Sequence, residues 1–487
     1  MRTFINKIVN LITPKIFVYA GLLIFIIIFY KGTLQRGDNF GIMVGLLPFI
    51  TILMYLLLKH PLWCFLFLFI ANYLIMGIIR YVPLPIPVGI FMDITICSCF
   101  LALFIEMIYK KMEWKRAVNP IAFVTSIWLL FCTLELLNPK AVPIADWASN
   151  VRGMAVYPIV MVILVSVILR KYKHLKIVLL IWSVLTLWAS FKGYWQKNQG
   201  FDSTELMWLY VGGGARTHLI STGIRYFSFF TDAGNYGANM GFSMVVFSIA
   251  AFYIKNKWLK LYFLIVAVAG GYGMVISGTR GSLAVPFAGY AICVVLSKNW
   301  KVAISATIIL ISAFFFLNFS TLGGSNQYIR RMRSAFDKND PSLNIRLENQ
   351  KRLKEYMADI PFGTSIGFYG YQVERSNSFY EISQIPSDSW YVQVWIQTGI
   401  VGLTLHILLL SAVIIMGGYI ILFKIRNKEL RGLLTAMLAG TFGMLIACYG
   451  NELLGQFPNS FLFYICQAFV FMGKYYDKEL EEYEQLT

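Results

Sequence analysis

Residues 65–79 read FLFLFIANYLIMGII, and residues 309–319 read ILISAFFFLNF. Apolar runs of roughly 15 to 20 residues recur along nearly the whole chain, and this length is enough to cross a hydrocarbon core about 30 Å thick. Strands of a membrane β-barrel would alternate apolar and polar residues, whereas these runs are apolar on every side. We therefore expect an all-α protein, a polytopic bundle of membrane-spanning helices.

The composition supports this fold class. The chain has 487 residues, of which 58% are hydrophobic and 14% are charged, whereas an ordinary soluble domain has about 25% charged residues. A soluble globular protein is therefore excluded. The first apolar run, residues 16–30, lacks a small-residue cleavage site and is followed by many more, so we interpret it as a span and not as a signal peptide.

The positions of the basic residues predict the topology. The formal net charge is +18, and basic clusters fall in alternate gaps, including 109–116, 170–176, 255–260 and 424–431. The positive-inside rule places these gaps, and both termini, in the cytoplasm. The segmentation gives about 14 spans. They are 16–30, 40–58, 62–79, 88–109, 119–137, 153–169, 175–191, 233–254, 258–276, 282–296, 302–317, 390–423, 432–449 and 458–473.

The chain shows no internal repeat of clear period, so we expect a single integral membrane domain over residues 1–487, with a cytoplasmic tail at 474–487. Two gaps between spans are long, 192–232 and 318–389, and both are external in this topology. The larger one, 318–389, should be partly helical. Long structured loops on a compact bundle tend to hold the functional residues.

The larger loop is basic and contains an amphipathic pattern. Between residues 330 and 354 it has eight basic residues against three acidic ones, which departs from the positive-inside trend. Leu353, Tyr356, Met357 and Ile360 have the spacing of one helix face. Arg346 falls on the same face. It should therefore meet an anionic partner, unless these basic residues only contact lipid headgroups.

Four external segments combine charged and polar residues. They are GIRYFSFFTDAGNYGANMGF (223–242), SGTRGS (277–282), NIRLENQKRLKEYMADIPFGTSIGFYGY (344–371) and IPSDSWYVQVWIQTGIVGL (385–403). Arg280 joins two spans in a very short turn, and an ionisable group at that depth indicates function by default. Guanidinium groups bind phosphate bidentately. Arg225, Arg280 and Arg346 would together suit a diphosphate, although Arg280 could instead extend to the membrane interface.

These segments resemble the O-antigen ligase and O-antigen polymerase superfamily of bacterial membrane glycosyltransferases over roughly residues 220–403. SGTRG matches the family's Ser-x-Arg-Gly turn, and RYFSFFTDAGNYGANM looks like its Arg…Gly-x-Phe-x-Asp-x-Asn segment. The stretch NIR…DIPFGTSIGFYGY is similar to the family's large periplasmic loop. DSWYVQVWIQTGIVGL resembles its His-Asn-x-Tyr-Leu-Gln…Glu-x-Gly-x-x-Gly segment. The order and spacing of the four make the resemblance more specific than any one of them.

The resemblance implies an enzyme of the bacterial inner membrane whose active site faces the periplasm. Such an enzyme transfers a glycan from undecaprenyl diphosphate to an acceptor hydroxyl with inversion, and the family assigns arginines to the diphosphate. The acceptor would be another glycan, lipid A-core or a protein, and membrane lipids would surround the enzyme. We expect no cofactor and no metal, because the histidines and cysteines lack metal-ligand spacing. Nucleic acid is not an expected partner, since positive-inside loops explain most of the charge.

One departure from the family bears on the mechanism. Where the family commonly has a loop histidine, this chain has Asp388. A carboxylate is unprotonated near neutral pH and can act as the general base, so Asp388 and Arg280 are the catalytic candidates. Alternatively, Ser387 and Asp388 cap the helix that begins near Trp390. If Asp388 is not the base, Asp232 and then His218 are the next candidates.

Asp232, Asn235 and Tyr369 are candidates for a sugar or acceptor subsite, although such residues at a membrane interface are more often packing. A repeat-unit polymerase of the same superfamily is one alternative function. A transporter or flippase of lipid-linked glycans is an alternative from another class. It should show inverted repeats, broken helices and carboxylates near the bilayer midplane, and only Asp93, Glu106 and Glu135 lie within spans.

Overall fold

The computed structural model describes residues 19–486 apart from 20, 28, 32, 35–37, 83–85, 141, 221–222, 338–340 and 369–378. These residues are 81% helical, and their strands are the two short ones of a single hairpin. The expected all-α membrane fold is confirmed. The chain divides into two compact units, one of Met1–Cys64 with Ser98–Lys110 and one of Phe65–Cys97 with Lys111–Thr487. The smaller unit contains α2 (Asp38–Lys59), and all the predicted site residues lie in the larger one.

Within the described ranges, ten helices are long and apolar enough to cross a membrane, so the predicted count of 14 is not confirmed. They are α3 (Pro61–Tyr81), α4 (Val88–Tyr109), α5 with η2 (Pro120–Leu137), α6 to α7 (Ile144–Ile168), α8 (Tyr172–Gln199), α11 (Ala233–Tyr253), α12 (Lys257–Ile276), α14 (Trp300–Phe319), α18 (Trp390–Phe423) and α19 (Lys428–Ala447). The turn η4 (Arg280–Leu283) with α13 (Ala284–Leu296) is a shorter apolar helix.

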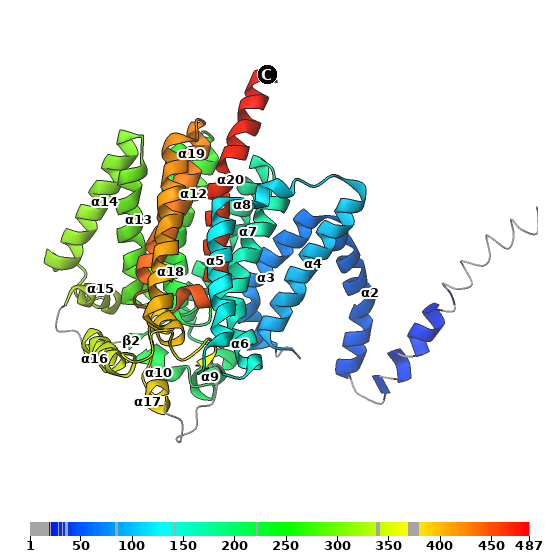
Figure 1. The fold of residues 1–487 in the computed structure, drawn as a ribbon, viewed down its shortest axis with the longest axis horizontal. Coiled ribbons are helices and arrows are strands. Elements are labelled where there is room, and N and C mark those ends of the chain that lie inside the picture. Colours follow the sequence, from blue (N-terminus) through cyan, green and yellow to red (C-terminus); the bar gives the residue numbers. More distant parts are fainter. Residues whose placement is uncertain are drawn as a thin grey trace, which may run out of the picture. The chain divides into compact units, whose positions relative to one another are not determined.

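Small residues hold the centre of the larger unit together. Helix α19 packs against α11, α13 and α20 (Asn459–Leu486), as Figure 1 shows for the labelled helices α13, α19 and α20. A Cβ on Gly440 would lie 2.4 Å from the Phe242 ring, and one on Gly443 would lie 2.2 Å from the Val285 carbonyl oxygen. Close helix contacts in membranes depend on such residues. Most side chains of α11 and α19 are accordingly buried.

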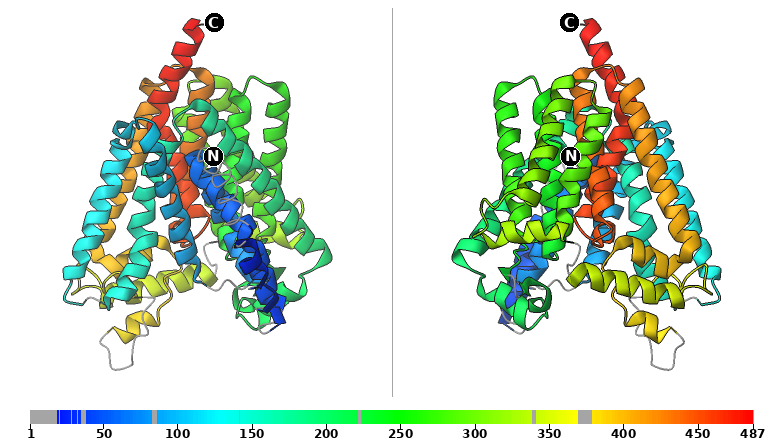
Figure 2. Two further views of the ribbon diagram at one scale, coloured as in Figure 1. Left: turned by 90° about the vertical axis from the view of Figure 1, so that its right-hand side faces the viewer. Right: turned by 90° about the vertical axis from the view of Figure 1, so that its left-hand side faces the viewer.

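The long loops gather at one end of the larger unit, away from the C-terminal end of α20 (Figures 1 and 2). The first loop contains α9 (Ser203–Tyr210), α10 (Ala215–His218) and the hairpin of β1 (Leu219–Ile220) and β2 (Gly223–Ile224). The second contains α15 (Gln327–Arg333), η5 (Ser334–Phe336), α16 (Pro341–Tyr356) and α17 (Tyr380–Ser383). The turn η7 (Leu453–Gly455) lies at the same end.

Helix α16 matches most of the expected amphipathic pattern. Leu353 and Met357 are buried in an apolar cluster, and Ile360 packs against it. Tyr356 was expected on the same face but is 42% exposed. Tyr356 is the last residue of α16, and its side chain does not share the buried face of Leu353 and Met357.

Helix α18 is interrupted at Gly399, which has a φ of 65°. The segment 361–367 fills the interruption. Thr364 and Ser365 donate their backbone N–H groups to the carbonyl oxygens of Ile396 and Gln397, at 2.9 and 3.0 Å. A Cβ on Gly399 would lie 1.9 Å from the Pro361 carbonyl oxygen, so only glycine fits there. Because the protein's own backbone occupies the break, it differs from the discontinuous helices that bind transported substrates.

The expected tail at 474–487 is the end of α20, which continues without interruption to Leu486. Asp477 accepts hydrogen bonds from the backbone N–H groups of Arg426 and Asn427, at 2.8 and 2.9 Å. The buried Tyr476 hydroxyl donates to the Leu169 carbonyl oxygen at 2.6 Å. These contacts attach the first part of the expected tail to the ends of neighbouring helices.

Candidate functional site

Arg225 and Arg280 meet at the short turn between α12 and α13. Arg225 follows β2, and its guanidinium donates to the Thr217 carbonyl oxygen at 2.9 Å and to the Thr279 hydroxyl at 2.8 Å. Thr279 immediately precedes Arg280 and is the N-cap residue of η4. The first long loop therefore lies against the SGTRG turn.

The second long loop approaches the same turn. Arg280 donates from Nη1 to the Ser334 hydroxyl at 3.2 Å, and Arg331 of α15 donates from Nε to the Gly278 carbonyl oxygen. Gly278 has a φ of +59°, and a Cβ there would lie 3.3 Å from carbons of both Arg225 and Arg331. A glycine is needed at this position for its left-handed conformation and for the close approach of two arginines.

Arg346 reaches the turn from α16. Its Nη2 atom donates to the Gly450 carbonyl oxygen at 3.2 Å, just beyond the end of α19. The neighbouring Asn451 lies against η4, because a Cβ on Gly281 would be 2.7 Å from its Nδ2 atom. That Nδ2 atom is buried and has no hydrogen-bond partner among the described residues.

The three arginines form a cationic cluster with one carboxylate. Burial lowers the pKa of Arg225 below its ordinary value, and the charges of Arg280 and Arg346 lower it further, whereas Asp232 acts to raise it. Asp232 is the N-cap residue of α11, where it accepts hydrogen bonds from the N–H groups of Gly234 and Asn235, at 2.6 and 2.9 Å. Positive charge therefore exceeds negative charge among these four side chains, and a bound anion would relieve the repulsion.

The candidate sugar residues beyond Asp232 differ in position. Asn235 is 1% exposed, and its Nδ2 atom donates to the Phe457 carbonyl oxygen at 2.6 Å and to the Thr231 hydroxyl at 3.2 Å. The Nδ2 atom of Asn459 in turn donates to the backbone carbonyl oxygen of Asn235 at 3.1 Å. Asn235 therefore joins α11 to the start of α20, which favours the packing alternative for this residue. Tyr369 lies outside the described residues.

Asp388 does not cap α18. The N-cap residue is Ser389, which makes no side-chain capping bond and instead donates to the Cys448 carbonyl oxygen at 3.2 Å. The capping interpretation of Ser387 and Asp388 is therefore wrong, because Ser389 occupies the N-cap position before Trp390 and no side chain caps the helix. Asp388 is exposed and has a φ of +44°. Such backbone strain in a non-glycine residue is found preferentially at functional sites.

A second carboxylate beside Asp388 was not identified from the sequence. The Ser387 hydroxyl donates to Oε1 of Glu452, which lies between α19 and η7. Burial raises the pKa of Glu452 above its ordinary value, and the negative charges of Asp388 and Asp232 also raise it. The available signal was an acidic residue in the short external gap between the apolar runs 432–449 and 458–473.

We compared the chain with known proteins. Residues 265–407 match the family model of the O-antigen ligases. This match supports the resemblance to the O-antigen ligase superfamily that the sequence motifs indicated. The search of curated proteins and the search of solved structures found no match. The protein is therefore a multi-pass membrane protein in which residues 265–407 are similar to the O-antigen ligases.

The matched segment begins within α12 and ends within α18. It contains Arg280, Arg346 and Asp388, together with the segment 361–367 that fills the break in α18. Arg225 precedes the matched segment and Glu452 follows it. The candidate site therefore includes residues outside the matched segment.

His218 has a structural role outside the matched segment. Its Nε2 atom accepts the N–H of Ala233 at 3.1 Å, and its Nδ1 atom lies 2.8 Å from the Gly214 carbonyl oxygen. Burial lowers the pKa of His218 to about 4. Because both ring nitrogens are used within the protein, His218 is a poor candidate for the base that was considered if Asp388 fails.

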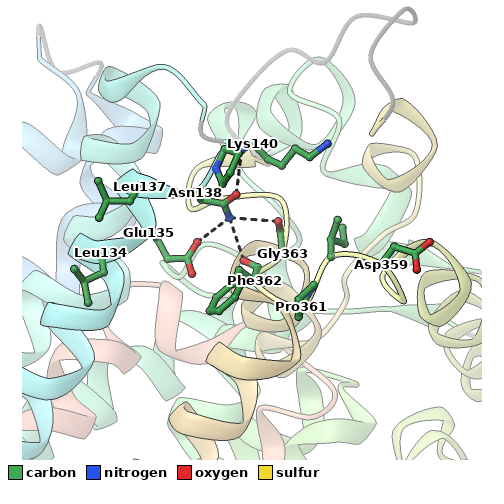
Figure 3. Close-up of a pocket in the computed structure, with 11 residues that line it drawn as sticks. Leu134, Glu135, Leu137, Asn138, Lys140, Asp359, Pro361, Phe362 and Gly363 are labelled. Carbon is green, nitrogen blue, oxygen red and sulfur yellow. Dashed lines mark hydrogen bonds between the residues drawn. The ribbon is translucent and has the colours of Figure 1, made fainter.

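A separate cavity of about 460 Å³ lies between η2 (Glu135–Leu137) and residues 359–363 (Figure 3). Asn138 spans it by donating to Glu135 Oε2 at 3.0 Å and to the Phe362 carbonyl oxygen at 3.2 Å. Its lining includes none of the arginines of the cationic cluster. This cavity is therefore not the cationic site.

We expect Glu452→Gln to stabilise the protein at neutral pH. A carboxyl group with a raised folded-state pKa stabilises the fold below its unfolded pKa of about 4.5, and this contribution is lost as the pH rises through the folded pKa. The amide keeps an acceptor for Ser387 and removes the buried charge. The apparent Tm of purified Glu452→Gln should therefore exceed that of the wild type at pH 7 to 8, and the difference should shrink toward about pH 4.

Glu381→Gln is the matched control, because Glu381 is an exposed acid in the same external region. It should leave the Tm unchanged over the whole pH range. A lower Tm for Glu452→Gln at neutral pH would mean that the Glu452 carboxylate stabilises the fold through an attraction stronger than its desolvation.

Proposed function

We propose that this protein transfers a glycan from undecaprenyl diphosphate to an acceptor hydroxyl at the periplasmic face of the bacterial inner membrane. The convergence of Arg225, Arg280 and Arg346 supports this proposal. The three side chains come from three separate segments of the chain and meet at one turn at the end of the helix bundle. A lipid diphosphate places two neighbouring phosphates at this depth, and guanidinium groups recognise phosphate bidentately.

The arginines would act mainly on the leaving group. As the glycosidic bond breaks, the bridging oxygen of the diphosphate gains negative charge. Cations that are already in place stabilise this transition state more than the ground state. Arg280 is the principal candidate, because it lies in the turn that Arg225 and Arg346 approach.

Asp388 would accept the proton of the attacking acceptor hydroxyl, on the face of the sugar opposite the diphosphate, which gives inversion. It is exposed and therefore accessible to an acceptor. Glu452 lies next to it through Ser387, and burial raises the pKa of Glu452 and so favours the protonated form of that carboxyl group. No cofactor or metal is needed for this reaction.

The acceptor defines the subclass of enzyme. A ligase would use lipid A-core, a protein glycosylating enzyme a side-chain hydroxyl, and a repeat-unit polymerase a second glycan. All three use the same lipid diphosphate donor, so the cationic cluster supports them equally.

The diphosphate site can be tested without knowing the glycan. We expect millimolar inorganic diphosphate to raise the apparent Tm of the purified protein, because ligand binding to the folded state stabilises it. Arg280→Ala should show little or no rise. Arg352→Ala should behave as the wild type, since Arg352 is an exposed residue of the same helix as Arg346. An equal rise in Arg280→Ala and wild type would contradict the assignment of Arg280 to the diphosphate.

A further inference from the structure

Another cavity, lined by polar residues, lies at the end of the larger unit where the long loops gather. Its volume is about 180 Å³, and its lining comes from the start of α4, residues 149–153, Tyr157 of α7 and residues 455–460. The segment 152–156 is a turn of π-helix, η3, between α6 (Ile144–Val151) and α7 (Tyr157–Ile168). Single π-helical turns of this kind are frequent at functional sites.

An ion pair lies at this cavity and is nearly neutral as a unit. Arg152 Nη1 donates to Asp93 Oδ2 at 2.5 Å, and the Tyr157 hydroxyl donates to Asp93 Oδ1 at 2.7 Å. A Cβ on Gly89 would lie 3.1 Å from Arg152 Nη2, so the glycine makes room for the guanidinium. Ionisable residues within membrane helices indicate function. The paired charges favour an uncharged, hydrogen-bonding ligand over a phosphate.

Ser460 provides an independent indication of a ligand. It is 3% exposed, it lines the cavity, and its hydroxyl has no hydrogen-bond partner among the described residues. Native proteins pair nearly all buried polar groups, and an unpaired one requires an explanation. A ligand hydroxyl in the cavity would supply the missing partner.

The cavity and the cationic cluster share one segment of chain, residues 450–457. Gly450 accepts a hydrogen bond from Arg346, whereas Gly455 and Phe457 line the cavity. The rings of Phe457 and Tyr157 are 5.9 Å apart at their centroids. Aromatic rings beside polar groups suit a sugar, which presents an apolar C–H face and a rim of hydroxyls.

We infer that this cavity binds a sugar ring. If the proposed function holds, that sugar belongs either to the acceptor or to the donor glycan, beyond the diphosphate. The volume is below the roughly 300 to 1,000 Å³ of sites for drug-sized ligands, which agrees with a subsite for one sugar unit. The paired charges of Arg152 and Asp93 would bind hydroxyls, and Ser460 would donate to or accept from another.

Binding can be measured without donor or turnover. The probes are glucose, galactose and N-acetylglucosamine at millimolar concentration, observed by saturation-transfer NMR on the purified protein. We expect transfer to at least one probe, and about fivefold weaker binding in Ser460→Ala, the effect of one neutral hydrogen bond. This variant should fold normally, because the Ser460 hydroxyl makes no bond to the protein. Arg152→Lys keeps the charge and should also weaken binding.

Ser190→Ala is the matched control. Its hydroxyl is buried and donates to the Ala269 carbonyl oxygen at 2.9 Å, so the variant should lose stability and keep sugar binding. No saturation transfer in the wild type, or equal transfer in the wild type, Ser460→Ala and Arg152→Lys, would overturn the inference.

Steady-state kinetics then separates the two sources of the sugar. A raised KM for the acceptor alone in Ser460→Ala assigns the cavity to the acceptor, and a raised KM for the donor alone assigns it to the donor glycan. Two results together would support the sugar site and contradict the proposed function. They are loss of sugar binding in Ser460→Ala and no rise in the Tm of the wild type with diphosphate. Unchanged sugar binding in Ser460→Ala, together with a rise in the Tm of the wild type with diphosphate, would contradict only the sugar site in the cavity.

Discussion

Arg280→Ala should reduce glycan transfer by a factor of at least about 10² to 10³, which is the usual effect of removing a preorganised group that stabilises developing negative charge. Arg280 lies in the turn that both long loops contact, through Thr279 and Ser334. Arg280→Lys should remain poor, because an ammonium group cannot reproduce the bidentate geometry of a guanidinium. Arg225→Ala and Arg346→Ala should each lose at least about tenfold, equivalent to about 1.4 kcal/mol.

The measurement is the transfer rate of undecaprenyl-diphosphate glycan by purified, monodisperse variants. Arg352→Ala is again the control, because it removes an exposed arginine from the second long loop. A variant of Arg280 that stays folded and fully active would end its assignment to the leaving group. If Arg280→Ala loses both its activity and its folded state, Arg280→Lys decides between a role at the leaving group and a structural role. A folded but poorly active Arg280→Lys would support the role at the leaving group.

Asp388→Asn should lose most of the transfer activity while the backbone stays unchanged. Asparagine tolerates a positive φ about as well as aspartate, so it fits the φ of +44° at this position. Its amide cannot accept the proton of the acceptor hydroxyl. Because Asp388 makes no cap for α18, the substitution should leave the Tm nearly unchanged.

The transfer assay should be run with a chelator present and with Ser389→Ala as the control. Ser389 is the N-cap residue but makes no capping bond with its side chain, so its loss should affect transfer little. A near-wild-type rate for Asp388→Asn would move the base to Asp232, since His218 uses both ring nitrogens within the protein and Glu452 favours its protonated form. It could also mean that departure of the leaving group carries the barrier and no base is needed.

The sequence located the helices better than it located their ends. Apolar runs predicted the course of α3, α4 and α11 to within a few residues. The predicted span 153–169 is instead the second part of a helical segment from Ile144 to Ile168 that contains a π-helical turn. A π-helical turn leaves no periodic signal, because five residues are too few to shift the apolar pattern detectably.

The break in α18 also needed the tertiary structure. The stretch WIQTGIVGL reads as continuous apolar helix, and nothing in it distinguishes Gly399 from a tolerated helical glycine. The interruption exists because the segment 361–367 donates its backbone N–H groups to carbonyl groups of α18. These partners are about 30 residues apart in sequence, so no local pattern records their pairing.

By itself the sequence determined the membrane class, the all-α fold and the residue types of the proposed diphosphate site. These follow from composition, from the length of the apolar runs and from arginines at the ends of spans, which are local properties. Only the tertiary structure decided that Arg225, Arg280 and Arg346 meet at one turn and that Glu452 joins Asp388. It also decided that Asn235 and His218 serve packing. The physical reason is that hydrogen bonds and charge interactions depend on distances between side chains, and the packing of distant segments sets those distances.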